Sequence, residues 1–342
     1  MDPITLYGGA FSLYTGRARS YLIKEGIAYR EEPHSSAYFY DVVLPKAGGR
    51  RGIPTIEFPN GDVIRDGVAI IDHYESTNGG KFSPETPKQR ILSLLFDVIG
   101  AEGMLRPCMH YRFNQGEEED EFLSFHFSTV YPAKDGAKDR IAFIRSTVLP
   151  AWGVRPNTKD LIETMHFKTL KKLNAHFSIY PYLFGNKPSI GDFGMIAPLY
   201  GHLGRDPVPL SLMQINAPRL FRWVERMNRS EPDIGEFADK STNYLANDEI
   251  PQTLIDVLKH FAIDFIPESV AAYDSVSQWL EVNRDLPLGT VAERDVGSCT
   301  FEIDGVEISA VAQPFRFYLL QRLHKEFDSL SEADRSDVRQ LL

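Results

Sequence analysis

The stretch RRGIPTIEF, from Arg50 to Phe58, decides how the first part of this 342-residue chain is interpreted. Thr55, Ile56 and Phe58 favour a strand, and the PNGD that follows is typical of a hairpin turn. Pro54 cannot donate a backbone hydrogen bond to a sheet, so it marks a strand start or a sheet edge. A cis peptide bond before it would be a placed feature, since cis bonds are almost confined to proline. A proline of this kind can leave a neighbouring backbone N–H and C=O free to hold a ligand.

Strand and helix signals alternate over residues 1–80. The predicted elements, in chain order, are a strand at Ile4–Tyr7, a helix at Thr15–Gly26, strands at Ile27–Tyr29, Pro54–Phe58 and Val63–Ile64, and a helix at Asp66–Ser76. A strand–helix–strand start predicts a right-handed parallel crossover. The hairpin around Asn60-Gly61 then adds an antiparallel edge to the same sheet.

Residues 86–245 are predicted to form an all-helical domain, because helical periods recur through most of them. Within this stretch, Ser189 and Asp192 form an S-x-x-D capping box, which satisfies free backbone N–H groups at a helix start. Strands first and helices second indicate an α+β fold.

Residues 246–342 are predicted to be an extension packed on the helical domain. Two helices are expected in it, at Gln252–Phe265 and Glu268–Val282, and Asp304-Gly305 marks a β-hairpin between alternating apolar and polar residues. Two further helical patterns close the chain. The extension therefore combines helices with a single hairpin.

The composition excludes several classes of function. The chain is 43% hydrophobic and 25% charged, with a formal net charge of −10, so we expect no general binding to nucleic acid or to anionic membranes. No apolar run is long enough to span a bilayer, and the N-terminus has no signal-peptide pattern. Cys108 and Cys299 are the only cysteines, which indicates neither a disulfide framework nor a metal site. A cytoplasmic location is the simplest expectation.

Three motifs give the sequence a resemblance to the glutathione S-transferase family. They are IPT (Ile53–Thr55), VIRDGVAIIDHYE (Val63–Glu75) and PSIGDFGMIAPL (Pro188–Leu199). The pairing of the first with the third is fairly specific, whereas either alone is weak. The resemblance covers roughly residues 3–235. It implies a thioredoxin-like domain over 1–80, an all-helical domain over 86–245, and a serine-type, larger bacterial-like member with a C-terminal extension.

The resemblance also implies a glutathione site. In that family the residue before the cis-proline, here Ile53, pairs through its backbone with the cysteinyl part of glutathione. Asp66 and Gly67 correspond to the residues that hold the γ-glutamyl end. The family more often has Glu-Ser or Gln-Ser here, so this chain lacks the hydroxyl and has a shorter acid. Asp66 is equally well explained as the N-cap of the following helix.

The glycyl carboxylate of glutathione needs a cation. Lys46, Arg50 and Arg51 precede Pro54, and we expect Arg51 to serve, although a solvated basic turn explains the cluster as well. No metal is implied.

The group that activates the thiol is expected to be Ser12, which falls where serine-type members carry their hydrogen-bond donor. Donation to the thiolate lowers the pKa of the thiol and so favours the nucleophile. Tyr7, Tyr14 and Thr15 remain alternatives, because the length of this loop varies, and Ser12 could also be an ordinary helix cap.

A second substrate, expected to be a small apolar electrophile, would bind between the first loop and the first long helix of the helical domain. Tyr14, Met109 and Tyr111 are the expected contacts, although such residues are more often plain core. The function predicted first is a cytoplasmic, homodimeric glutathione transferase. The alternatives are a non-catalytic binding or scaffold protein on the same fold, and a glutathione-dependent lyase or isomerase.

Overall fold

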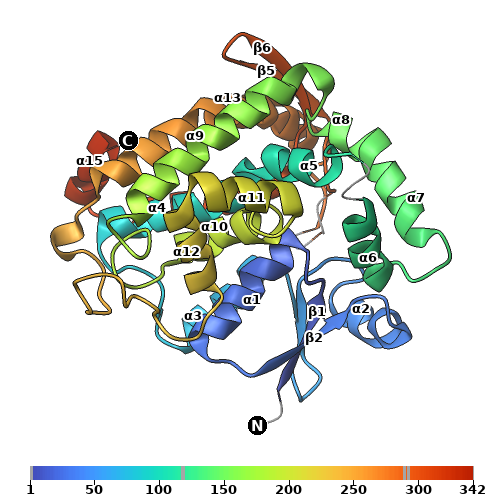
Figure 1. Ribbon diagram of the computed structural model, residues 1–342, viewed down its shortest axis with the longest axis horizontal. Helices are drawn as coiled ribbons and strands as arrows, with labels where there is room; N and C mark the ends of the chain where they lie inside the picture. The colour runs from blue at the N-terminus through green and yellow to red at the C-terminus, as the bar shows by residue number, and fades with distance from the viewer. Residues whose placement is uncertain (1–2, 117–119, 288–289, 291–292, 342) are drawn as a thin grey trace.

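A computed structural model of the chain describes residues 3–116, 120–287, 290 and 293–341. The N-terminal sheet and its helices lie at the bottom of Figure 1, and the helices of the middle and C-terminal parts of the chain lie above them. The predicted fold class is confirmed: a thioredoxin-like domain with a mixed sheet precedes a helical domain, and a hairpin lies near the C-terminus.

The N-terminal residues form a four-stranded sheet in the order β2-β1-β3-β4. The elements are β1 (Ile4–Gly8), α1 (Leu13–Glu25), β2 (Tyr29–Pro33), the π-helix η1 (Phe39–Val43), α2 (Leu44–Lys46), β3 (Thr55–Glu57), β4 (Val63–Arg65) and α3 (Gly67–Thr77). β1 and β2 are parallel, as the crossover predicts, and β3 pairs antiparallel with both β1 and β4. The mixed sheet therefore has the predicted parallel start and antiparallel edge.

Alternate residues of β1 pack on opposite faces of the sheet, as the twofold period of a strand requires. Leu6 lies in one core with Leu22 of α1 and Ile70 of α3. Tyr7 packs with Phe39 on the other face. Both faces of this strand are covered, which fixes its register.

The second strand was predicted at Ile27–Tyr29, and this prediction is wrong about where the strand begins. β2 begins at Tyr29, which pairs with Ile4. Gly26 ends α1 with a φ of 77°, a left-handed conformation that glycine adopts easily. The carbonyl of Ala28 accepts a hydrogen bond from the Ile4 N–H at 3.2 Å. Tyr29, the next residue, is therefore the first residue of β2 to pair with β1.

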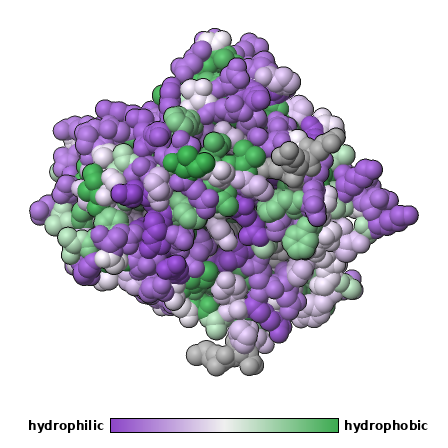
Figure 2. Space-filling model, viewed as in Figure 1, coloured by the Kyte–Doolittle hydropathy of each residue, from purple (hydrophilic) through white to green (hydrophobic). Residues whose placement is uncertain are grey.

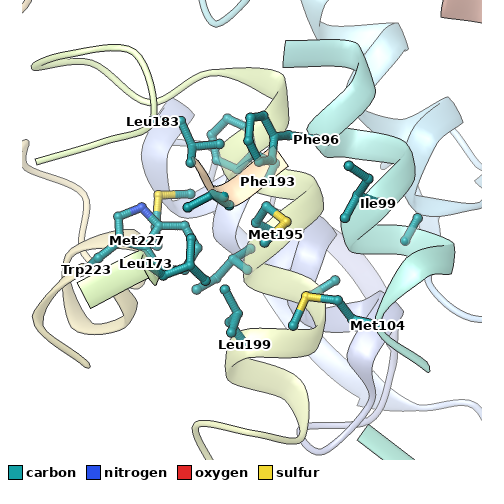
Figure 3. Packing of buried hydrophobic residues seen from close by; sticks show 14 of the residues in the cluster. Phe96, Ile99, Met104, Leu173, Leu183, Phe193, Met195, Leu199, Trp223 and Met227 are labelled. Carbon is teal, nitrogen blue, oxygen red and sulfur yellow. The ribbon is translucent and has the colours of Figure 1, made fainter. Parts of the chain in front are cut away.

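The helical part of the chain begins after α3. Its elements are α4 (Pro87–Val98), the π-helix η2 (Ile99–Gly103), α5 (Leu105–Phe113), α6 (Asp120–Val130), α7 (Gly136–Phe143), the π-helix η4 (Ile144–Val148), α8 (Leu149–Ala151), the 3₁₀-helix η5 (Pro156–Thr158), α9 (Lys159–Phe177), α10 (Ile190–Gly201), α11 (Pro207–Asn216) and α12 (Pro218–Met227). Helix α10 is buried almost all round, and Figure 3 shows its Phe193 and Met195 among side chains from α4, α9 and α12.

Glycines let α10 approach its neighbours closely. A Cβ on Gly100 of η2 would lie 2.2 Å from the backbone of Gly194, and one on Gly201 would lie 2.5 Å from Leu13 Cα in α1. A side chain at either glycine would therefore push α10 away from η2 or from α1. The second contact joins the helical part of the chain to the start of α1.

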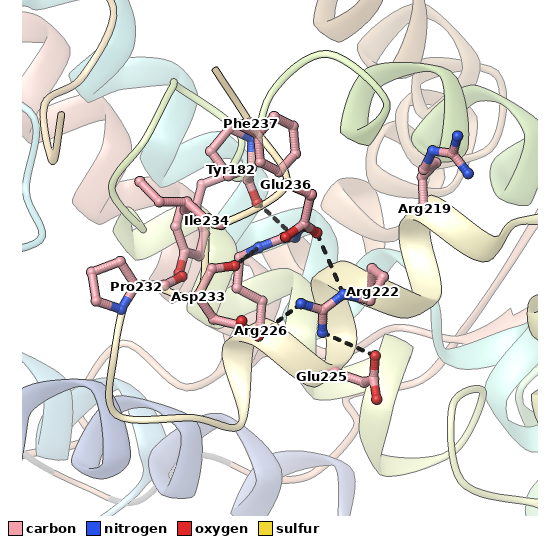
Figure 4. A network of polar contacts seen from close by, with 12 residues as sticks. Tyr182, Arg219, Arg222, Glu225, Arg226, Pro232, Asp233, Ile234, Glu236 and Phe237 are labelled. Carbon is pink, nitrogen blue, oxygen red and sulfur yellow. Dashed lines mark hydrogen bonds and ion pairs between the residues drawn. The ribbon is translucent and has the colours of Figure 1, made fainter. Parts of the chain in front are cut away.

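A network of polar contacts fixes the loop that follows α12 (Figure 4). Arg226 is almost fully buried, and its Nη2 lies 2.7 Å from Glu236 Oε1. The Tyr182 hydroxyl donates to the Pro232 carbonyl at 2.5 Å. Lys24, in α1, donates to the same Tyr182 hydroxyl at 3.1 Å. The loop is thus held against both the helical domain and the N-terminal domain.

The C-terminal residues continue the same core. Their elements are the 3₁₀-helix η6 (Ala246–Asp248), α13 (Gln252–Val282), β5 (Ser298–Ile303), β6 (Val306–Val311), α14 (Pro314–Ser329) and α15 (Glu332–Leu341). The two helices expected at Gln252–Phe265 and Glu268–Val282 are one continuous helix, which passes through Pro267. The Asp304-Gly305 hairpin forms as predicted.

Side chains of the extension are shared with the helical domain. Leu254, Phe261 and Phe265 of α13 belong to the same buried cluster as Phe96 of α4. The boundaries at 80, 86 and 245 stay predictions, but this shared core shows that α13 packs directly on the helices before it.

The surface seen in Figure 2 is largely hydrophilic, with hydrophobic residues in small separate groups. Within the described parts of the chain, no helix has both the length and the apolar composition needed to cross a membrane.

The capping box at the start of α10 is confirmed and extends further than the sequence indicated. Asp192 is completely buried, and its Oδ2 accepts from the Ser189 N–H and hydroxyl, both at 2.8 Å. Its Oδ1 accepts from the Leu183 N–H at 3.2 Å and from Trp223 Nε1 at 3.0 Å. One carboxylate therefore joins the helix start, the preceding loop and α12.

Replacing this carboxylate should destabilise the whole helical domain. We expect Asp192→Ala to lower the free energy of unfolding by about 3 kcal/mol or more, because it leaves several buried donors without an acceptor. Urea unfolding followed by circular dichroism measures this. Asp337→Ala, at an exposed position in α15, is the control and should cost below about 1 kcal/mol. Equal effects of the two changes would contradict the assigned role.

Candidate functional site

The peptide bond between Ile53 and Pro54 is cis, and β3 begins directly after it, at Thr55. The Pro54 carbonyl accepts a hydrogen bond from the Asp66 N–H at 2.9 Å. Among the described residues, neither the N–H nor the C=O of Ile53 has a hydrogen-bond partner. Ile53 is partly exposed, so its peptide groups form a free edge that an extended ligand could pair with.

Asp66 lies beside this edge, at the start of α3. Its φ is 87°, and its Oδ1 accepts from the Val68 N–H at 2.8 Å. Asp66 is therefore the N-cap of α3, which was one of its two predicted roles. Burial raises the pKa of its carboxyl, and the Arg17 guanidinium and the N–H groups of Val68 and Ala69 oppose that rise. The helix start also offers N–H groups to an anion. A ligand-binding role for Asp66 stays a prediction.

Gly67 marks the point where three parts of the domain converge. A Cβ at Gly67 would lie 3.4 Å from Arg17 Cδ, 3.6 Å from the Tyr14 carbonyl oxygen and 3.7 Å from Pro54 Cγ. These are ordinary contact distances. The start of α1, the cis-proline and the start of α3 therefore meet around one residue.

A chain of charges runs from this point to the C-terminal extension. Arg17 and Asp97 form a buried ion pair. Arg322 of α14 has its Nη1 3.5 Å from Asp97 Oδ2 and also pairs with Asp72 of α3. Sequence reasoning missed this arrangement, because Arg322 is more than two hundred residues away and carries no motif of its own.

Arg51 is the cation whose surroundings best suit an anionic ligand. Its guanidinium carbon lies 5.5 Å from the ring centre of Tyr40 and 5.3 Å from that of Tyr131, which are cation–π contacts. Within the residues that the structure describes, Arg51 has no carboxylate partner. Its alternative Lys46 donates to the Gly61 carbonyl at 2.8 Å, and Arg65 donates to the Arg50 carbonyl at 3.1 Å.

Ser12 is the N-cap of α1. Its Oγ accepts from the Thr15 N–H at 3.3 Å, and the side chain is partly exposed. The hydroxyl proton is not used by this contact, so capping and donation to a ligand are compatible. A role in thiol activation stays a prediction.

The alternatives to Ser12 differ in their surroundings. Thr15 is completely buried beneath β1, and the Tyr7 hydroxyl donates to Glu57 Oε2 at 2.9 Å. Tyr14 is partly exposed, and its hydroxyl lies 3.5 Å from Oε1 of Glu102, in η2. Of these candidates, Ser12 is therefore the partly exposed residue whose hydroxyl hydrogen no described contact uses.

The expected contacts of the second substrate are mostly core. Met109 is buried in one cluster with Phe11 and Phe127, at the place where the pocket was expected. Tyr111 is buried too, with its ring centre 4.9 Å from that of His166. The side chains of this first cluster fill the contact between the first loop and α5. Roles for Met109 and Tyr111 in binding stay predictions.

Family models match both parts of this architecture. Residues 6–82 match the model of the glutathione S-transferase N-terminal domain, and residues 156–231 match that of the C-terminal domain. The two matched ranges lie in the thioredoxin-like domain and in the helical domain. The expected serine-type subclass stays a prediction. No curated protein matches the chain significantly in sequence.

Similar solved structures include three glutathione transferases. One, from Methylobacterium radiotolerans in complex with glutathione sulfonate, is 14% identical, with 72% of this chain and 100% of that chain covered and a TM-score of 0.42. Another, from Phanerochaete chrysosporium, is 15% identical over 68% and 98% of the two chains, with a TM-score of 0.47. A Tau class enzyme from mango is 18% identical over 76% and 99%, with a TM-score of 0.40.

A buried arginine holds the loop before Ser12 to the helical domain. Arg112 Nε and Nη2 bind the Asp206 carboxylate at 2.6 and 2.7 Å. The same guanidinium donates to the carbonyls of Phe11 and Gly201, both at 2.7 Å. Since Phe11 directly precedes Ser12, this arginine fixes the position of the candidate thiol donor from the other domain.

Loss of this anchor should be costly. We expect Arg112→Met to lower the free energy of unfolding by about 3 to 5 kcal/mol, because Asp206 is left as a buried, unpaired carboxylate. The double variant Arg112→Met/Asp206→Leu should recover part of that loss, since it removes the unpaired charge as well. Guanidinium unfolding of the three proteins measures both effects. A double variant less stable than Arg112→Met would contradict the assigned cause.

Proposed function

We propose that this protein is a glutathione transferase that binds glutathione along the Ile53–Pro54 edge of its N-terminal domain. The observation that carries the proposal is the peptide of Ile53, which has no hydrogen-bond partner among the described residues. Arg51, which forms no ion pair with any described carboxylate, precedes it by two residues, and the Asp66 N–H at the start of α3 bonds to the next carbonyl, that of Pro54. The matches to both glutathione S-transferase domain models support it.

The charges along this edge suit the two ends of glutathione. The peptide groups of Ile53 pair with the cysteinyl residue, as neighbouring strands pair. Arg51 binds the glycyl carboxylate. At the other end, Asp66 accepts from the γ-glutamyl ammonium, while the first N–H groups of α3, including that of Gly67, donate to the γ-glutamyl carboxylate.

The hydroxyl of Ser12 donates a hydrogen bond to the bound sulfur, which stabilises the thiolate that forms when the thiol releases its proton to solvent. The thiolate sulfur forms a bond to the electrophilic carbon of the second substrate, and the leaving group departs with the bonding electron pair. The second substrate is a small electrophile with an apolar body. We also propose that the protein works in the cytoplasm as a homodimer, and that it needs no metal.

Titration calorimetry with reduced glutathione tests the binding part. We expect one glutathione per chain, with Arg51→Met and Asp66→Asn each weakening the affinity about tenfold, as the loss of a charge-assisted contact predicts. Arg155→Met, an exposed arginine outside the site, should bind as tightly as the unchanged protein. Absence of binding at millimolar glutathione would overturn the proposal in favour of a non-catalytic scaffold.

Replacing Ser12 tests the chemistry. We expect Ser12→Ala to reduce kcat for conjugation of an aryl halide by about 100-fold and to raise the pKa of the bound thiol, followed by thiolate absorbance. Ser12→Thr keeps both a cap and a donor, so it should retain most of the activity. An unchanged kcat in Ser12→Ala would make Tyr14 the donor. A product that is an isomer of the substrate, formed while the glutathione is recovered unchanged, would indicate an isomerase.

A further inference from the structure

One face of α13 is apolar although it is open to solvent. The opposite face of this helix packs into the core that the extension shares with the helical domain, and against the hairpin β5–β6. The solvent face carries five large apolar side chains that are 41 to 63% exposed, namely Ile263, Ile266, Val270, Tyr273 and Leu280, which we call the α13 stripe. A helix at a protein surface ordinarily carries polar residues on its solvent face. Contiguous exposed apolar surface of this kind marks a site of interaction.

The spacing of the α13 stripe is that of a helix that packs lengthwise against another helix. Its members follow one another at intervals of three, four, three and seven residues, and Ser277 stands where the last interval divides into four and three. Alternating intervals of three and four are the heptad pattern through which two helices interlock their side chains. The stripe is about 26 Å long at the rise of a helix, and α13, with 31 residues, extends beyond it at both ends.

Charged residues flank the stripe on the same face of the helix. Asp256 and Lys259 lie before it, and Glu281 and Arg284 follow it. None of these four charges forms an ion pair with another residue that the structure describes. Lys259 and Glu281 are about 33 Å apart at the rise of a helix, so they cannot pair within one chain. Toward the middle of the stripe, an acid precedes a base at one end and a base precedes an acid at the other.

The α13 of a second copy, aligned antiparallel, complements both features. A twofold axis at Val270, the middle member of the stripe, brings together positions that are equally distant from that residue. Lys259 then lies opposite Glu281 of the partner subunit. Asp256 lies opposite Arg284 of the partner subunit. A parallel alignment would instead place each charge beside its own copy, where like charges repel.

A lipid surface matches the stripe less well than a second copy does. The formal net charge of the chain is −10, which opposes binding to an anionic membrane. A lipid surface would also leave the order of the charges at the two ends without a role. An isologous pair uses that order, because the same surface of each copy meets the other about a twofold axis.

We propose that the α13 stripe is the interface of a homodimer, in which two copies pack antiparallel about a twofold axis near Val270. The apolar side chains of both stripes form its centre, and the Lys259–Glu281 and Asp256–Arg284 pairs, each formed twice, lie at its ends. This inference rests on the proposed homodimer and assigns its interface to the extension, outside the two ranges that match the glutathione S-transferase models. It does not depend on the chemistry at the glutathione edge.

Sedimentation velocity over a wide range of protein concentration tests the centre of this interface. We expect the unchanged protein to form a dimer that dissociates on dilution. Val270→Asp should weaken the dimer at least about 100-fold, because the twofold axis brings the two introduced carboxylates together in a buried interface. Ile215→Asp is the matched control: Ile215 of α11 is 75% exposed and lies outside the stripe, so this variant should dimerise like the unchanged protein. Circular dichroism checks that both variants are folded.

The outcomes separate this interface from the rest of the proposed function. An undiminished dimer in Val270→Asp would overturn the α13 interface and leave the homodimer to another surface. A monomer of the unchanged protein at every concentration would overturn the interface and the homodimer together. Val270→Asp should still bind one reduced glutathione per chain, because the proposed glutathione site lies within one N-terminal domain. Absence of glutathione binding in the unchanged protein would contradict the transferase function and not this interface.

Charge reversal tests the antiparallel orientation. Lys259→Glu places two acids opposite each other at both ends of the interface, so we expect it to weaken the dimer about tenfold. The double variant Lys259→Glu/Glu281→Lys should restore the affinity, and the distance between the two positions excludes rescue within one chain. Lys325→Glu, at an exposed position in α14, should leave the dimer unchanged. A double variant that dimerises no better than Lys259→Glu would overturn the proposed arrangement.

Discussion

The buried ion pair between Arg112 and Asp206 is the interaction on which the geometry of the candidate site depends. Its guanidinium also holds the carbonyls of Phe11 and Gly201, one from the loop before α1 and one from the end of α10. Both side chains are almost fully buried, so a guanidinium that lost any of these acceptors would be strongly destabilised. The first loop is consequently fixed relative to the helical domain. Ser12, which directly follows Phe11 in this loop, is fixed with it.

The same principle extends to the C-terminal part of the chain. Arg316 and Arg322, both in α14, reach Glu268 and Asp97, which lie in α13 and α4. Each pair is buried or partly buried, where ion pairs gain from the low dielectric but require close geometry. The extension is therefore part of the structure around the site. Through Asp97 and Arg17 it is joined to the residues that surround Gly67.

Residues of the candidate site differ in how far their sequence reveals them. Pro54 was recognisable because the special backbone chemistry of proline is a property of the residue itself, and Asp66 because an acid before an apolar helical run is a cap signal. Arg322 was not recognisable: its importance comes from its contacts with Asp97 of α4 and Asp72 of α3. Those are relations between residues distant in sequence, for which a single chain contains no local signal.

Local rules by themselves determined the Asp304-Gly305 hairpin and the capping box at Ser189, since each depends on residues a few positions apart. The tertiary structure alone decided where β2 begins, because that start is set by pairing with Ile4. It also decided that α13 continues through Pro267, because the contacts of Phe261 and Phe265 in the shared core, and of Glu268 with two arginines, stabilise both halves as one helix. Which charges are left without a partner is likewise a property of the assembled fold, because pairing depends on distance in space.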